Sequence, residues 1–119
     1  MLGVDDVSRA TTFWESAIGY VPLQPPSDDT WVILVPADGI GSQLALNKSE
    51  TTVQPHPRTH LDLYATDAKA EIARLLALGA REVDWDSYSP DADFVVLEDP
   101  DGNRFCVIEQ DPNWSGFKK

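Results

Sequence analysis

The chain has 119 residues, a mass of 13.1 kDa and a net charge of −11, from twenty acidic and nine basic residues. This length accommodates one domain, and 42% hydrophobic residues are enough for a packed core. The acidic balance excludes nucleic acid and anionic membrane surfaces as partners, because both require a basic binding face. No apolar run reaches the length of about 18 residues needed to span a membrane. With a single cysteine, Cys106, and an acidic N-terminus, the sequence predicts a cytoplasmic protein.

The first half of the chain predicts one helix followed by three strands. Apolar residues recur at helical spacing from Asp6 to Ile18, with Asp5 or Asp6 to cap the start and Gly19 after the end. Stretches rich in strand-forming residues then predict strands at 21–24, 31–35 and 43–47. The polar segment from Lys48 to Arg58 is the one obvious linker.

The second half of the chain predicts the same order of elements. A strand is expected at 60–65, a helix from Asp67 to Leu78 that ends at Gly79, and further strands at 82–85, 94–98 and 104–109. Adding 60 to the residue number carries Ala10, Ala17 and Gly19 onto alanines and a glycine of the second half. Adding 63 carries Asp38 and Gly39 onto an Asp-Gly pair in the same way. The chain is therefore predicted to be a repeat.

The repeat predicts an α+β fold of two β-α-β-β-β modules, whose strands form a curled mixed sheet, or cup, with the helices outside. Module one is expected at 1–47, the linker at 48–58, module two at 59–110 and a tail at 111–119, all in one domain. Only Met1 to Val4 precede the first helix, so we expect the first strand to be truncated.

Alternation along the strands assigns their side chains to two faces. One face is uniformly apolar and is expected to lie under the helices; it includes Val32, Leu34, Leu44, Leu46, Leu63, Leu97, Phe105 and Val107. The opposite face mixes aromatic, ionisable and amide side chains. We expect it to bind a small organic ligand, with the pocket formed by Trp31, Gln43, His60, Asp62, Tyr64, Phe94 and Cys106. The alternative is an ordinary solvated face, partly covered by a second chain.

Two sequence segments of the second half carry a resemblance to a known family. With the doubled module, RTHLDL at 58–63 and EDPDGNRFCVI at 98–108 resemble the glyoxalase/bleomycin-resistance/extradiol-dioxygenase (vicinal oxygen chelate) superfamily, in particular its small glyoxalase-like branch. The resemblance implies a cup in which four side chains bind a divalent metal. The first of these positions falls before Met1, and the other three correspond to Gln43, His60 and Cys106. Because only His60 keeps the usual residue type, we expect no resident cofactor and at most weak divalent metal binding.

Three side chains carry alternatives that the sequence leaves open. His60 is either a proton-transfer group, and then the candidate catalytic residue, or a histidine held by hydrogen bonds in its strand. Cys106 is either a nucleophile or metal ligand, or an inert buried thiol. Asp62 pairs with Glu98 as an acid/base couple, or each carboxylate binds a nearby arginine or backbone amide.

Two functions are consistent with this reading. The resemblance implies a small-molecule protein that, if it is an enzyme, is of the lyase, isomerase or dioxygenase type; His60 would then transfer a proton or hold a metal. The alternative is a non-catalytic protein that sequesters its ligand, as drug-resistance members of the superfamily do without metal. Because the short first strand leaves a sheet edge unpaired, we also expect a homodimer.

Overall fold

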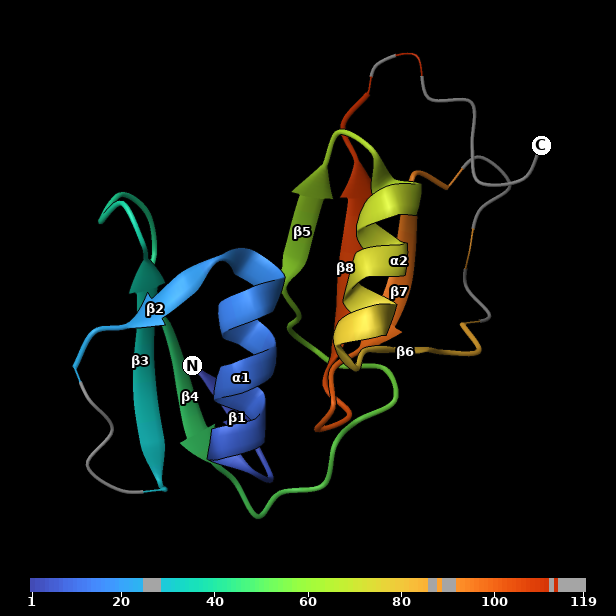
Figure 1. Ribbon diagram of the computed structural model, residues 1–119. Coiled ribbons are helices and arrows are strands. Elements are labelled where there is room, and N and C mark those ends of the chain that lie inside the picture. Colours follow the sequence, from blue (N-terminus) through green and yellow to red (C-terminus); the bar gives the residue numbers. More distant parts are fainter. Residues whose placement is uncertain (25–28, 86–87, 89–91, 112, 114–119) are drawn as a thin grey trace. The chain divides into compact units, whose positions relative to one another are not determined.

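The computed structural model describes residues 1–24, 29–85, 88, 92–111 and 113 and divides the chain into two compact units, Met1–Val53 and Gln54–Lys119. The boundary lies inside the predicted linker. Each unit contains a four-stranded mixed sheet with one helix against it (Figure 1). The α+β class and the two β-α-β-β-β modules are thereby confirmed, with one open sheet in each module. Most of the tail expected at 111–119 lies outside the described residues.

The first unit runs β1 (Leu2–Val4), α1 (Val7–Ile18), β2 (Tyr20–Pro22), β3 (Trp31–Pro36) and β4 (Leu44–Lys48). In the sheet the strand order is β1-β4-β3-β2, with β1 parallel to β4 and the other pairs antiparallel. The short first strand pairs with β4 through the register Leu2 to Leu46.

The second unit repeats this arrangement. It runs β5 (Asp62–Ala65), α2 (Ala68–Leu78), β6 (Arg81–Glu82), β7 (Phe94–Glu98) and β8 (Arg104–Glu109). Its strand order is β5-β8-β7-β6, with β5 parallel to β8. The predicted strand at 60–65 begins two residues late, and the strand expected at 82–85 is displaced to Arg81–Glu82. His60 therefore lies two residues before the start of β5, in the segment that leads into the sheet.

Local chemistry explains where both helices begin and end. Asp6 accepts a hydrogen bond from the Arg9 amide at the start of α1, and Asp67 accepts one from the Ala70 amide at the start of α2. Gly19 and Gly79 follow the two helices with positive φ angles of 70° and 119°, which favour glycine. These caps are the ones that the sequence predicts.

Burial confirms the assignment of the apolar strand face for every residue named above except Leu63, which is half-buried. In the first unit Val32, Leu34, Leu44 and Leu46 are buried with Phe13 and Trp14 of α1. The corresponding core of the second unit contains Leu75, Leu97, Phe105 and Val107. Among the described residues no helix is long and apolar enough to cross a membrane.

Candidate functional site

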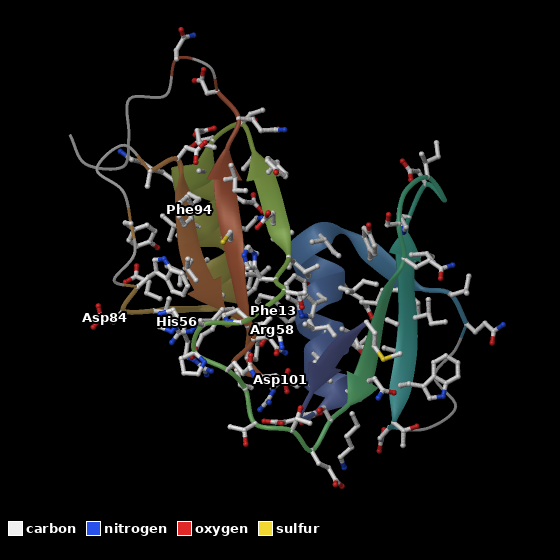
Figure 2. The ribbon with its side chains drawn as sticks, turned by 180° about the vertical axis from the view of Figure 1, so that it is seen from behind. Phe13, His56, Arg58, Asp84, Phe94 and Asp101 are labelled. Carbon is white, nitrogen blue, oxygen red and sulfur yellow. The ribbon has the colours of Figure 1, made fainter. Side chains whose placement is uncertain are left out.

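A cavity of about 270 Å³ lies in the second unit. Side chains of β5, β7 and β8 that alternate with the helix-facing core form one wall: Asp62, Phe94, Val96, Arg104, Cys106 and Ile108. Segments outside the sheet add Pro57, His60 and Trp85. In Figure 1 α2 lies in front of this sheet, so Figure 2 shows the sheet from the side away from α2, with Phe94 and His56 labelled. The cavity is thus on the face that the sequence assigned to a ligand.

Three ionisable side chains of the cavity lining meet. The Nδ1 atom of His60 lies 2.9 Å from Oδ1 of Asp62 and 3.9 Å from Sγ of Cys106. His60 and Asp62 are partly exposed, with 41% and 39% of each side chain accessible, whereas Cys106 is buried. The register Asp62 to Cys106 across the parallel strands β5 and β8 places the carboxylate and the thiol side by side.

The surroundings of Cys106 keep its sulfur protonated. Burial, followed by the negative charge of Asp62 and a hydrogen bond to the same carboxylate, raises the pKa of the thiol to about 11. The nucleophile and metal ligand in cysteine chemistry is the thiolate, and almost none of it forms here near neutral pH. The structure therefore favours the inert alternative for Cys106 over the nucleophile.

Aromatic side chains form the outer wall of the site. Arg104 lies over the ring of Trp85, at 5.9 Å from the ring centroid, and His56 lies against the same ring at 4.9 Å. The ring of Tyr88 is 5.3 Å from that of Phe94, and its hydroxyl accepts a hydrogen bond from the Val96 amide. Burial raises the pKa of Tyr88. These contacts tie the segment before β7 to the sheet face.

The predicted pocket residues separate into two groups in the structure. His60, Asp62, Phe94 and Cys106 line the cavity. Tyr64 is 61% exposed and lies outside the lining, while Trp31 and Gln43 belong to the first unit, where both are exposed.

The acid/base couple of Asp62 and Glu98 is not formed, because each carboxylate has a basic partner of its own. Glu98 pairs with Arg81 at 2.7 Å, and Asp62 pairs with His60. This is the alternative that sequence analysis left open, with His60 in place of an arginine.

Sequence reasoning did not predict the parts of the wall that come from loops. Trp85 was assigned to a short strand and His56 to a solvated linker, yet the two rings are in contact. One feature of the sequence could have identified Trp85. It is a large aromatic residue in an otherwise acidic stretch with no predicted helix, so packing against a helix does not explain it.

The donor set in the cavity lining fits only a weak metal site. Donor atoms of His60, Asp62 and Cys106 lie within 4.8 Å of one another. Zn–S and Zn–N bonds of about 2.3 and 2.0 Å allow two donors of one zinc ion to lie up to about 4.3 Å apart. The distances from Nδ1 of His60 to Asp62 and to Cys106, 2.9 and 3.9 Å, are within this limit. The thiol must also lose its proton, and a hydrogen bond already joins His60 to Asp62. Three donors, one of them a protonated thiol, would therefore hold a zinc ion only weakly.

Fold and cavity together define a two-module α+β protein with an aromatic-walled cavity on one of its sheets. The sequence profile of the glyoxalase-like domain matches residues 1–108. The chain belongs to this family.

Solved structures share the fold of this chain. The chain is 28% identical to TnmS3, an antibiotic binding protein from Streptomyces sp. CB03234, with a TM-score of 0.62 over 91% of this chain and 89% of that one. A glyoxalase/bleomycin resistance protein/dioxygenase family enzyme from Burkholderia phytofirmans PsJN is 16% identical, with a TM-score of 0.66 over 91% and 93%. Protein ATC0852 from Agrobacterium tumefaciens is 22% identical, with a TM-score of 0.66 over 91% of each chain. The comparison with curated proteins finds no match.

Proposed function

We propose that this protein binds a small organic molecule, of one or two rings, in the cavity of the second unit. The observation that carries this proposal is a cavity of about 270 Å³ whose lining combines aromatic side chains with a few polar groups. Ligand pockets in proteins typically measure roughly 300–1,000 Å³ and combine these same features. The similarity to an antibiotic binding protein supports the same class of function.

The walls favour a flat ligand. Trp85 and Phe94 both line the cavity, and each is held by a neighbouring side chain, Arg104 against Trp85 and Tyr88 against Phe94. Because these rings are already packed, a ligand that stacks on them does not have to order them first. Aromatic faces attract other aromatic rings by more than their buried area alone.

The polar groups favour binding over covalent catalysis. The Cys106 thiol has its pKa raised to about 11 and supplies almost no nucleophile, and the Glu98 carboxylate is paired with Arg81. What remains is the pair of His60 and Asp62, which hydrogen-bonds a ligand without forming a covalent bond to it. The best-supported function is therefore reversible binding, which is the ligand-sequestering alternative of the sequence analysis.

One observation favours a second candidate, a metal-assisted enzyme of the lyase, isomerase or dioxygenase type. His60, Asp62 and Cys106 are the residues that would hold the ion. A bound divalent ion would polarise a ligand oxygen. The aromatic walls would orient the ligand in the same way under either function.

Calorimetric titration with 2-naphthol tests the binding proposal. We expect saturable binding with one site per chain, and we expect Trp85→Ala to weaken it by about tenfold or more, because stacking contacts of this kind dominate small interfaces. Trp31→Ala is the matched control, since Trp31 lies in the first unit. Failure of the wild-type protein to bind the probe, or an equal loss in both variants, would contradict the proposed site.

A further inference from the structure

Within the described part of the chain, the imidazole of His60 makes its polar contacts through one ring nitrogen. Nδ1 lies 2.9 Å from Oδ1 of Asp62 and 3.9 Å from Sγ of Cys106. Among the residues that the structure describes, none forms a hydrogen bond with Nε2, although His60 lines the cavity. One ring nitrogen is thus held by the protein, and the other has no partner among these residues.

Asp62 determines which nitrogen carries the proton in neutral His60. A carboxylate only accepts hydrogen bonds, so the 2.9 Å contact requires Nδ1 to be the donor. The proton on Nδ1 leaves Nε2 with a lone pair, as in other histidines whose tautomer is set by the partner of the opposite nitrogen. Cys106, whose protonated thiol also hydrogen-bonds to Asp62, helps to hold the carboxylate in place.

We infer that Nε2 of His60 accepts a hydrogen bond from the bound ligand, with Asp62 as the positioning residue, and that the cavity therefore prefers flat aromatic molecules that carry a hydroxyl group. This inference rests on the proposed function and makes its ligand class specific. The aromatic walls accept any flat ring, whereas the lone pair on Nε2 distinguishes a ring with an O–H donor from one without.

The tautomer is measured on the wild-type protein without any ligand. Nitrogen-15 NMR at about pH 8, with a chelator present, distinguishes a protonated from an unprotonated ring nitrogen in neutral histidine. The chain has only two histidines, so a His56→Gln variant assigns both sets of signals. We expect His60 to carry its proton on Nδ1 in the wild type and to shift toward Nε2 in Asp62→Ala. A proton on Nε2 in the wild type would overturn the inference.

The ligand preference is measured with two probes that differ in one donor. We expect 2-naphthol to bind about three- to tenfold more tightly than 2-methoxynaphthalene, the range for one additional hydrogen bond. Asp62→Ala should remove this difference, so the ratio of the two affinities in that variant is the measured quantity. Asp93→Ala, an exposed carboxylate outside the cavity lining, keeps the difference.

The outcomes separate the inference from the proposed function. Equal affinity for the two probes in the wild type would overturn the inference while the proposed function stands. Binding of neither probe would overturn the proposed function and the ligand preference with it, and the NMR measurement would still decide the role of Asp62. Thermal melting of each variant shows that a lost preference is not caused by unfolding.

Discussion

The two units have the same topology and the same local devices. Each begins its helix with a capping aspartate and ends it before a glycine with positive φ. After the third strand of each unit the chain turns in the same way, since the Gly39 amide donates to the Pro36 carbonyl and the Gly102 amide to the Asp99 carbonyl. The repeat is therefore preserved down to single backbone hydrogen bonds.

The units differ in the sheet face away from the helix. Positions 63 residues apart are equivalent in the repeat, so Trp31 corresponds to Phe94 and Gln43 corresponds to Cys106. Trp31 is 49% exposed and Gln43 is exposed, whereas Phe94 is half-buried and Cys106 is buried. The same strand positions thus face solvent in one unit and a cavity in the other.

The difference comes from the segments that lie over the strands. The connection before β7 spans residues 83–93, three more than the equivalent connection before β3 at 23–30. It contributes Trp85 and Tyr88 to the sheet face, and the segment before β5 contributes Pro57 and His60. The cavity of the second unit therefore depends on its loops, which tolerate insertion better than its strands do.

The largest expected effect is on the free energy of unfolding, and it differs between the two equivalent turns. Asp99 is fully buried and accepts hydrogen bonds from the amides of Asp101 and Asn103, while the exposed Asp38 accepts one from the Ile40 amide. Asp99→Ala leaves buried donors unpaired and should lower the free energy of unfolding by about 2–4 kcal/mol. Asp38→Ala should lower it by less than about 1 kcal/mol, since water replaces the lost acceptor. Urea unfolding measures both, and equal losses would show that the two turns are equally buried in solution.

A smaller effect tests the environment of Cys106. Its pKa is raised to about 11 in the folded chain, so iodoacetamide should react slowly with it near pH 8. Asp62→Asn removes the nearby negative charge and should speed this reaction several-fold, whereas Asp93→Asn should not change it. Because burial is the largest cause of the raised pKa, the variant should still react more slowly than the unfolded chain.

The same pKa predicts how stability changes at alkaline pH. Below an ordinary thiol pKa of about 9 the group is protonated in both the folded and the unfolded chain, and its contribution to stability is complete. As the pH rises from about 9 toward 11, the unfolded chain loses this proton and the folded chain keeps it, so stability falls. Cys106→Ala should remove this part of the pH dependence. An unchanged pH profile in that variant would contradict the raised pKa.

The smallest expected effect is that of zinc. We expect the protein to purify without a full equivalent of metal, and we expect a chelator to leave its melting temperature unchanged. Excess zinc should raise the melting temperature by on the order of a few degrees through the donors His60, Asp62 and Cys106. His60→Ala should abolish this increase and His56→Ala should not. A full equivalent of zinc after dialysis would contradict the weak site.

Sequence reasoning predicted the regular elements well because their signals are local. Both helices and their caps, the strands at 94–98 and 104–109 and the apolar strand face follow from periodicity and from the residues at helix ends. The prediction was less accurate where an element is held by a neighbour. The strand β6 has two residues, and its position is set by pairing with β7 and by the contact of Arg81 with Glu98.

For the candidate site, the sequence identified the residue types and the strand face. It did not show which of these residues lie next to one another. His60, Asp62 and Cys106 were selected from three separate positions, and their meeting depends on the register of β5 with β8. Tyr64 has the same alternation as Asp62 on β5, yet it remains outside the cavity lining. Alternation determines which face of the sheet a side chain is on, whereas the loops that cover the sheet determine whether it lines the cavity.

The sequence by itself determined the doubled module, the family and the chemical character of the strand face away from the helices. Each of these depends only on short-range patterns and on residue identity. Only the tertiary structure decided that Trp85 covers the face, that Glu98 is paired with Arg81 and that Asp62 binds Nδ1 of His60. These contacts join residues brought together by strand pairing and by loops that cross the sheet. Their hydrogen-bond geometry depends on distances that no one-dimensional pattern contains.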